Sequence, residues 1–471
     1  MVRIKFSSRL GSAIGLLLAL CIVFPGTGFA QILYGSVVGS VTDESGASIP
    51  GAQVSVTNKV TGAIRTTTTN QNGGYSVPTL QSGNYTVLVN RDGFRSASND
   101  AVSVTPNTVN RVDFRLSVGQ VSETVVVEST AAALQTDRAE VKEEISSQTL
   151  TEIPVSGQRN YQSLFVTIPG IAPPSTPHSV PSNPSRALSW QTNGNNTASN
   201  NTRIDGASAT NVWLPHIASY VPALESIESV SVVTNSFDAE QGLAGGASVN
   251  VSIRSGTNEI HGAAFHYHMG NWSQARNFFL PSNQDIPKYV YNQYGGRVGG
   301  PILKNKLFYF VSWEGTDDHR FAGSLRTVPT AIMRNGDLST SSRLVYDPLT
   351  GQSNGVGRLP FANNRIPSDR IHPTSAVLMG RLPQENNPAP NGIPTQNYFA
   401  TGNAAFNRDT IDSKFNFNMG NKTTMFARLS WLDFDLLAPT AFGDIGGSPI
   451  AFGNPGKGFG NTWSGTLGST H

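Results

Sequence analysis

The amino-acid sequence predicts a mainly β protein built of three consecutive parts: a β-sandwich, a small α/β domain and the first strands of an incomplete membrane β-barrel. Short runs in which apolar and polar residues alternate recur along the chain, separated by turns that contain glycine or asparagine. Only 14% of the 471 residues are charged, whereas a typical soluble protein has roughly 25%. Beyond residue 30, no apolar run approaches the roughly 20 residues of a membrane-spanning helix. A helical membrane protein is therefore excluded.

The first 30 residues have the order of a secretory signal peptide. Three basic residues precede an apolar stretch at 13–24, and the small residues Gly28 and Ala30 fit the −3 and −1 positions of a cleavage site. We therefore expect cleavage between Ala30 and Gln31. Cleavage would remove Cys21, the one cysteine, and would change the formal net charge from +2 to about −1. The exported chain would then have no disulfide and too little positive charge to bind nucleic acid.

Residues 31–119 contain seven short alternating runs, which we expect to form the β-sandwich. The turns between the runs carry glycine or asparagine, the residues that most easily take a positive φ. This spacing is typical of an all-β domain with two packed sheets. The expected strands are Ser36–Thr42, Ala52–Asn58, Ala63–Thr69, Tyr75–Val77, Tyr85–Asn90, Ala101–Thr105 and Val109–Leu116.

Three motifs in this part resemble the carboxypeptidase regulatory-like domain: GSVTDESGASIPGAQVSV at 39–56, NGGY at 72–75 and LQSGNYTVLVNRDGF at 80–94. The resemblance implies a transthyretin-like fold, which is grouped with carbohydrate-binding-like sandwiches. It does not imply peptidase activity, because the sequence has no zinc-binding spacing such as HExxH. A structural or adaptor role is favoured over direct glycan binding, since only Tyr75, Tyr85 and Phe94 are available to stack on a sugar.

Residues 120–135 form a linker that contains a candidate partner-binding segment. Glu123, Thr124, Val125, Val126 and Val127 resemble a Ton box, the short extended segment with which outer-membrane transporters add a strand to the periplasmic energy transducer TonB. The β-branched residues favour an extended backbone, and main-chain hydrogen bonds would supply the affinity. The alternative is that the segment is the last strand of the sandwich, and the sequence leaves both possibilities open.

Residues 136–258 are expected to form the α/β domain, with helical spacing at Thr136–Gln148 and a strand at Ile227–Thr234. IDG at 204–206 and DAEQG at 238–242 are similar to motifs in the plug domain of TonB-dependent receptors, most closely the Oar-like subgroup. Gln241 stands where tyrosine or phenylalanine is commoner. The resemblance implies a plug that occludes a barrel.

Residues 259–471 show the alternation of a membrane barrel, in which one face of each strand meets lipid and the other faces the lumen. In the first strand we expect Ala263, Phe265, Tyr267 and Met269 to face lipid, and His266 and His268 to face the lumen. A tight turn is expected from Gly299 to Asn305, and another at Asn421–Lys422. The lipid-facing sets of the later strands would be Tyr294 and Val298; Leu307, Tyr309, Val311 and Trp313; Ile411, Phe415, Phe417 and Met419; and Met425, Ala427, Leu429 and Trp431.

The region Thr316–Ala405 is rich in proline, asparagine and glycine, and we expect one long extracellular loop there. His261, His266 and His268 suggest a metal site, but no carboxylate is spaced to complete one, so lumen-facing polar residues are favoured. GGRVGG at 295–300 is not followed by a helix pattern, as a dinucleotide site requires. We expect no catalytic residues, no cofactor and no metal.

The combined pattern and resemblance imply a TonB-dependent transporter or receptor of the outer membrane, with its N-terminal domain in the periplasm. Its partners would be the TonB complex, outer-membrane lipid and an extracellular ligand such as a carbohydrate or a peptide. A surface adhesion or signalling receptor that does not transport is the alternative, and a glycan-active enzyme is disfavoured because no motif pairs two carboxylates. About five or six barrel strands are discernible, whereas large plugged barrels use about 22. We therefore expect this chain to be a fragment of a longer reading frame.

Overall fold

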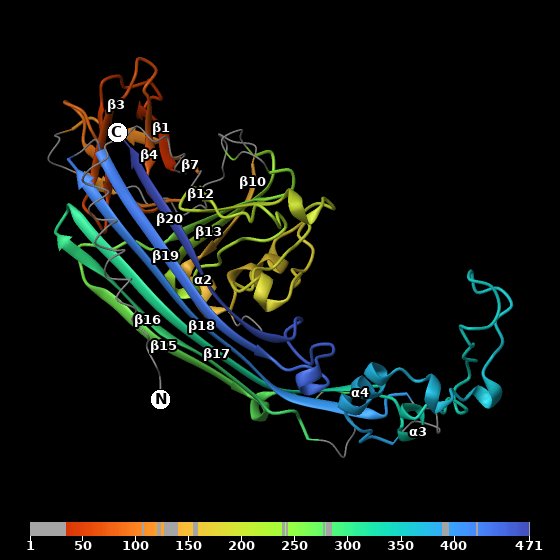
Figure 1. Cartoon of the computed structure of the whole chain (residues 1–471). Helices are drawn as coiled ribbons and strands as arrows, with labels where there is room; N and C mark the ends of the chain where they lie inside the picture. The colour runs from red at the N-terminus through yellow and green to blue at the C-terminus, as the bar shows by residue number, and fades with distance from the viewer. Residues whose placement is uncertain are drawn as a thin grey trace, which may run out of the picture.

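The computed structural model describes residues 34–470 except 106–107, 120–123, 127–139, 154–158, 238–240, 242–243, 277, 279–284, 389–394 and 421–422. The predicted cleavage site at Ala30 and Gln31 lies outside the described residues. Three bodies follow one another along the chain: a sandwich, a middle domain and a large curved sheet of long strands (Figure 1). In the described part of the chain, no helix is long and apolar enough to cross a membrane.

The N-terminal sandwich has two sheets around a core of its own. Alternate residues of its strands are buried, and Val37, Val54 and Val87 are fully inaccessible. The predicted last strand is divided at Val112–Asp113 into two short strands. One sheet contains β4 (Gly74–Leu80), β1 (Gly35–Asp43), β7 (Val109–Arg111) and β8 (Phe114–Leu116); the other has the order β3 (Ile64–Thr68), β2 (Gln53–Asn58), β5 (Gly83–Asn90), β6 (Ser96–Val104) and β9 (Thr124–Val126).

The middle domain is built on a five-stranded sheet whose order is β10-β13-β14-β11-β12. The helix expected at Thr136–Gln148 is wrong over its described part, because residues 141–146 form an edge strand antiparallel to β13 and the helix begins only at Ser147. Ile145 is buried in the domain core, which holds this segment against the sheet. The elements are β10 (Val141–Ser146), α2 (Ser147–Glu152), η1 (Tyr161–Thr167), η2 (Val180–Ser182), η3 (Thr197–Ser199), β11 (Asn201–Ile204), β12 (Ala207–Ser208), η4 (Leu224–Ser226), β13 (Ile227–Asn235) and β14 (Ser248–Ile253).

Six antiparallel strands form the large sheet, each paired with its neighbours in chain order. The turn expected from Gly299 to Asn305 is shorter in the structure, because β16 continues to Leu303 and the turn is confined to 304–306. The turn expected at Asn421–Lys422 lies outside the described residues. The strands are β15 (His261–Gly270), β16 (Tyr289–Leu303), β17 (Leu307–Arg326), β18 (Tyr398–Met419), β19 (Thr423–Ala438) and β20 (Gly456–Thr470).

The long loop is shorter than the sequence indicated. Strand pairing between β17 and β18 continues out to Arg326 and Tyr398, so the connection spans 327–397 instead of 316–405. Many residues at the ends of these strands are polar, so the apolar–polar alternation that predicts a strand is weak there. The sequence therefore predicted shorter strands and a longer loop. The described part of the loop contains α3 (Ala331–Arg334), η7 (Ala362–Asn364), η8 (Ser368–Arg370) and α4 (Pro373–Arg381).

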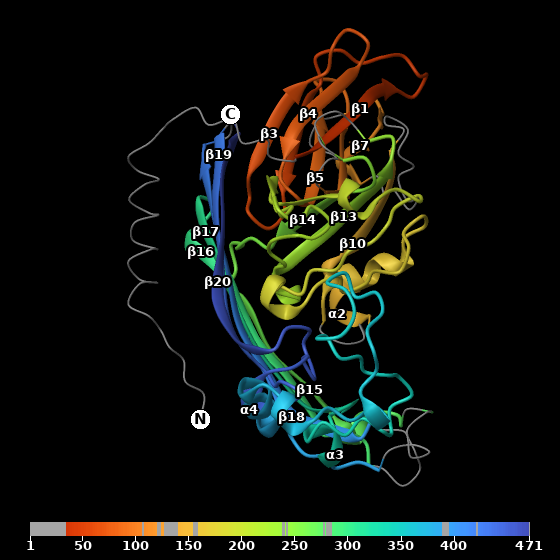
Figure 2. The same ribbon diagram turned by 45° about the vertical axis from the view of Figure 1, so that its right-hand side comes forward.

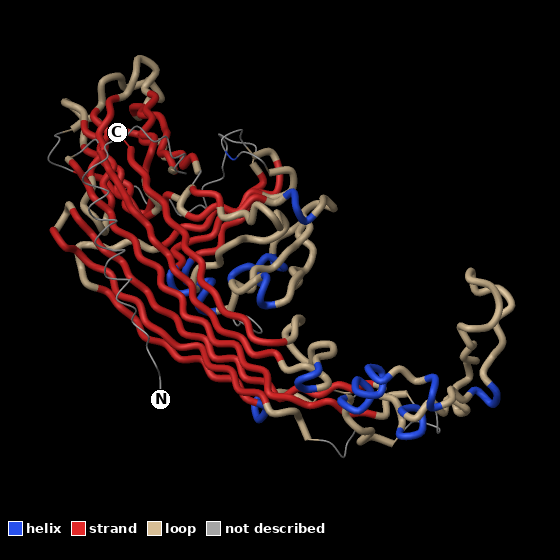
Figure 3. The backbone as a smooth tube through the Cα atoms, in the orientation of Figure 1, coloured by secondary structure: helices blue, strands red, loops and turns tan. Residues whose placement is uncertain are grey.

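The middle domain lies on the concave face of the large sheet, and the sandwich lies beyond it at the end that holds the short turns (Figures 1 and 2). The long loop extends from the opposite end, and the strands run the full distance between the two ends (Figure 3). Side chains of the sheet join the middle domain's apolar core: Phe310, Phe406, Leu432, Phe434 and Leu436. The two bodies therefore share one core, whereas the sandwich has a separate one.

The inward faces of the strands agree with the predicted alternation except in β15. There the prediction is wrong: Tyr267 lies opposite the buried Gln293 and faces the middle domain. The guanidinium carbon of Arg159 lies 3.7 Å from the centre of the Tyr267 ring. His266 and His268 consequently face away from the middle domain. Alternation shows which side chains of β15 share a face, but it does not show which face points toward the middle domain. That choice is set by the cation–π contact with the middle domain, which favours the aromatic residue on the inward face.

Candidate functional site: the interface between the middle domain and the sheet

Asp412 of β18 is the most fully bonded side chain at this interface. It is completely buried, and its carboxylate accepts hydrogen bonds from the Tyr220 hydroxyl at 2.7 Å, the Ser226 hydroxyl at 2.7 Å and the Ala223 amide at 3.2 Å. A fourth bond comes from Ser430 on the neighbouring strand at 2.6 Å. Three of the four donors therefore belong to one short segment of the middle domain, residues 220–226, and they replace the water that a buried carboxylate would otherwise need.

A second sheet carboxylate, Asp318 of β17, binds two arginines from different bodies. Arg186 of the middle domain donates to it at 2.9 Å, and Arg320 of the same strand makes two bonds of 2.7 Å. Burial lowers the pKa of Arg186 to about 10, and Asp318 counteracts part of that shift. Arg186 therefore stays charged at neutral pH. Its guanidinium carbon also lies 4.1 Å from the centre of the Phe406 ring.

The IDG motif places a carboxylate of the middle domain against cations of the sheet. Asp205 and Gly206 both have positive φ values, 47° and 85°, and form the two-residue turn between β11 and β12. Such a turn favours the Asp-Gly pair. The turn directs the Asp205 carboxylate to Lys414 of β18 at 2.8 Å and to Arg428 of β19 at 3.5 Å. The Lys414 ammonium also donates to the carbonyl of Ile253 at 2.9 Å.

Two further buried carboxylates continue the charged interface. Glu225 of the middle domain lies 3.3 Å from Arg159 of its own domain and 3.6 Å from Arg297 of β16. Glu314 of β17 accepts from Arg408 of β18 at 3.3 Å. Each carboxylate thus has a guanidinium partner, which offsets the cost of removing the charge from water.

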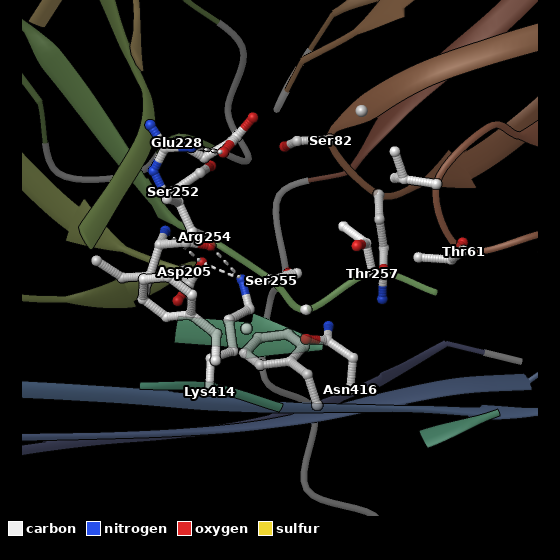
Figure 4. A pocket seen from close by; sticks show the side chains of 18 of the residues that line it. Thr61, Ser82, Asp205, Glu228, Ser252, Arg254, Ser255, Thr257, Lys414 and Asn416 are labelled. Atoms are coloured by element: carbon white, nitrogen blue, oxygen red, sulfur yellow. Dashed lines mark hydrogen bonds and ion pairs between the residues drawn. The ribbon is translucent and has the colours of Figure 1, made fainter. Parts of the chain in front are cut away.

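A cavity of about 490 Å³ lies where the three bodies meet, on the sandwich side of this interface (Figure 4). Figure 4 shows Asp205 and Lys414 on one wall, with Glu228 and Arg254 above them and Thr61 of the sandwich opposite. Glu228 and Arg254 form an ion pair of 3.3 Å. The lining combines apolar surface, including Ile253 and Phe310, with polar groups of both charges, so the cavity can hold water.

The described side chains of this interface form a polar, ion-paired contact. Among the described residues, no three of the side chains that commonly bind metals converge on one point. His266 and His268 instead share the side-chain oxygen of Asn292, at 3.3 Å and 2.8 Å. His261 lies apart from them, 3.5 Å from Glu259.

The candidate Ton box is described only in part. Glu123 and Val127 lie outside the described residues, while Thr124, Val125 and Val126 form β9, which pairs in parallel with Ser96–Ser98 of β6. This position at the edge of the sandwich matches the alternative that the sequence left open, and it leaves the binding of TonB untested.

Of the residues that hold the interface together, sequence reasoning singled out Asp205, through the IDG motif, and did not single out the sheet carboxylates. Of the DAEQG motif, Gln241 is described and donates to Glu140 at 3.0 Å. Asp412, Asp318 and Glu314 each occupy an inward position of a strand whose outward face is largely apolar. A charged residue at such a position is the feature of the sequence that could have identified them. The middle-domain partners of Asp412 and Asp318 could not be named, because they come from irregular segments, and the partner of Glu314 is Arg408 on the neighbouring strand β18.

Two family models match the chain. Residues 36–117 match the carboxypeptidase regulatory-like domain, and residues 252–471 match an outer membrane β-barrel domain. The TonB-dependent transporter Oar of Myxococcus xanthus is 24% identical over 317 residues, which are 64% of this chain and 28% of that protein. The relative is a transporter, in agreement with the expectation that the chain is not an enzyme.

Two solved outer-membrane structures, a transporter and a siderophore receptor, also match at low similarity. The outer membrane transporter YddB from Escherichia coli has a TM-score of 0.39 and 12% identity, over 64% of this chain and 34% of that one. The siderophore receptor PirA from Acinetobacter baumannii has a TM-score of 0.32 and 14% identity, over 69% of this chain and 44% of that one. The chain is thus an outer-membrane protein whose residues 36–117 match a carboxypeptidase regulatory-like domain and whose residues 252–471 match an outer membrane β-barrel domain, and over 317 residues it is similar to the TonB-dependent transporter Oar, of which it spans 28%.

Proposed function

We propose that the chain is part of a TonB-energised outer-membrane transporter in which the middle domain is the plug. Ligand binds at the end of the sheet that carries the long loop, and TonB engages residues 123–127 on the periplasmic side, where the sandwich lies. The family matches support the outer-membrane role, and the ligand, the plug and energisation by TonB belong to the proposal.

The observation that carries the proposal is the set of bonds around Asp412. One carboxylate of the sheet receives three donors from a single segment of the middle domain, residues 220–226. A plug must stay closed at rest and yet be released by a pull of limited energy. Buried ion pairs and charge-assisted hydrogen bonds suit this requirement, because water that enters on opening can take over each bond.

Photo-crosslinking in living cells tests the proposal. A photoreactive amino acid at position 124 or 126 should crosslink to TonB, and the crosslink should disappear when tonB is deleted or a protonophore collapses the proton gradient. The same amino acid at Lys59, on the sandwich surface, is the matched control and should give no TonB adduct.

A receptor that does not transport is the second candidate, and the pairing of β9 with β6 favours it. A segment held in the sandwich is not available to TonB. Crosslinks from positions 124 and 126 to β6 alone, unchanged by deletion of tonB, would support this candidate and contradict transport.

A further inference from the structure

One turn of the sandwich lies against a short turn of the large sheet. Residues 59–63 connect β2 to β3, and the short turn connects β16 to β17. The amide of Asn258 donates to the carbonyl of Val60 at 3.0 Å, and Asn258 exchanges two hydrogen bonds of 2.7 Å with Asn305 of the short turn. Asn258 thus connects the sandwich to the end of the sheet beside which it lies (Figure 2).

The sandwich turn has a shape that permits this contact. The side-chain oxygen of Asn58 accepts hydrogen bonds from the amides of Val60 and Thr61, both at 3.0 Å, and so fixes the turn. Gly62 has a φ of 70°, and a Cβ atom at this position would lie 2.8 Å from the side-chain oxygen of Asn305. Glycine therefore both forms the turn and allows its close approach to the sheet.

Further contacts between the sandwich and the other two bodies are polar. Arg65 of β3 donates to the hydroxyl of Thr470 in β20 at 3.4 Å, and Lys142 of β10 donates to the hydroxyl of Thr105 in the sandwich at 3.2 Å. Among the described residues, the apolar core of the sandwich contains none from the other two bodies. Domains joined by a polar interface without a shared core are expected to move relative to each other. The sandwich can therefore separate from the sheet and return to it.

The docked sandwich forms one wall of the cavity at the junction of the three bodies. Thr61 and Ser82 of the sandwich lie across the cavity from Ser252 and Asp205 of the middle domain, and the sheet contributes Lys414 (Figure 4). Ser252 is only 7% exposed in this arrangement. The sandwich thus covers part of the middle domain at the end of the sheet that holds the short turns.

We propose that the sandwich is a reversible lid. While it is docked through Gly62, Asn258 and Asn305 it covers the cavity, and it must move away before a solute that has passed the middle domain can leave the sheet. This role rests on the proposed function, in which the middle domain is the plug. The segment proposed to bind TonB, residues 123–127, lies in the chain between the sandwich and the middle domain. A pull on this segment therefore acts on the lid and on the plug.

Labelling of a cysteine in the cavity tests whether the sandwich is docked. In the purified full chain with Ser252→Cys, a maleimide that carries a long polyethylene glycol chain should react slowly. Gly62→Leu forces a side chain against Asn305 and should raise the rate about tenfold, because the rate follows the fraction of undocked molecules. Asn258→Ala removes the side-chain bonds to Asn305 without altering the sandwich, and it should raise the rate by less.

The matched control for the labelling is Gly46→Leu. Gly46 also has a positive φ, 88°, but a Cβ atom there would meet nothing within 4 Å. The control adds backbone strain without the contact and should leave the labelling slow. Fast labelling without a second substitution, or equal rates for Gly62→Leu and Gly46→Leu, would overturn the docked lid. The assay needs neither TonB nor a transported solute, so its failure is distinct from a missing TonB crosslink, which would contradict the proposed function.

A disulfide tests whether the lid closes the pathway. A Cβ atom at position 62 would lie 3.6 Å from the Cγ atom of Asn305, whose place the sulfur of a cysteine would take. Gly62→Cys/Asn305→Cys can therefore form a bridge after a small shift. With Asp412→Ala added to weaken the plug contact, potassium chloride conductance across planar bilayers should be lost on oxidation and recovered on reduction. Gly62→Cys without the second cysteine is the control and should be insensitive to oxidation. Equal conductance of the oxidised and reduced double-cysteine protein would overturn the lid.

Discussion

The hydroxyl of Tyr220 donates a hydrogen bond of 2.7 Å to the carboxylate of Asp412, which lies 192 residues further along the chain. Burial, and after it the charge of Asp412, raises the pKa of Tyr220 well above its ordinary value. The hydroxyl therefore stays protonated and continues to donate throughout the physiological pH range. This bond joins the middle domain to the wall of the sheet.

Substitution of Tyr220 should weaken the interface less than substitution of Asp412. Tyr220→Phe deletes one donor and should destabilise the closed state by about 1–3 kcal/mol. Asp412→Ala leaves several buried donors unpaired and should cost about 3–5 kcal/mol. Planar-bilayer conductance should show more frequent openings in that order. Asp435→Asn, on the outward face of β19, should behave like the wild type, and equal effects of all three variants would contradict the anchoring role.

Asp205 and Lys414 should be energetically coupled. A double-mutant cycle with Asp205→Asn and Lys414→Met should give a coupling energy of about 1–3 kcal/mol in urea titrations followed by tryptophan fluorescence. Asparagine is chosen because it tolerates the positive φ of position 205, where alanine would add backbone strain. The solvent-accessible pair Arg365–Asp337 in the long loop, with side chains 61% and 25% exposed, is the control and should give a coupling below about 0.5 kcal/mol. Similar coupling energies for both pairs would show that burial at the interface does not strengthen the Asp205–Lys414 ion pair.

The sandwich should fold without the rest of the chain. Its core is separate from that of the middle domain, so a fragment of residues 34–118 should give a β-type circular dichroism spectrum and a cooperative thermal transition. Val87→Ala, at a fully buried position, should lower its stability by about 2 kcal/mol. Ile64→Ala, at a position that is 40% exposed, should cost less than about half as much. A non-cooperative transition would mean that the sandwich depends on its neighbours.

A disulfide between β6 and β9 should prevent TonB from using its proposed segment. Ala97 and Val125 are direct partners in the parallel pairing, and Cys21 is the one native cysteine, so Ala97→Cys/Val125→Cys should form a single defined bond. Oxidation should abolish the TonB crosslink from position 124, and reduction should restore it. Undiminished crosslinking in the oxidised protein would show that TonB binds elsewhere. Either single cysteine variant is the control and should be insensitive to oxidation.

The sequence predicted the strands more accurately than the contacts between bodies. Alternation between apolar and polar residues is local, so it located β2, β5 and the inward faces of β16 to β19. It was wrong for β15, where the side that contains Tyr267 is selected by Arg159 from a distant segment. It also shortened β17 and β18, because charged and other polar residues interrupt the alternation near the ends that face the long loop.

The candidate site shows the same limit. Asp205 was selected for its motif, and its turn geometry follows from the Asp-Gly pair. Its partner Lys414 could not be named, because that contact depends on how a whole domain is placed against a sheet.

The position of β10 at the edge of its sheet has a mechanical consequence. The proposed TonB-binding segment precedes this strand, so tension applied there loads β10 before any other part of the middle domain. Among the described strands, β10 has a single neighbour, β13, to which it is joined by six paired positions. Those bonds can break one after another, as in peeling, while β13, β14 and β11 remain assembled. A modest force sustained over a long extension would then detach one edge of the domain, and the remaining sheet would serve as the template on which it re-forms when the tension ends.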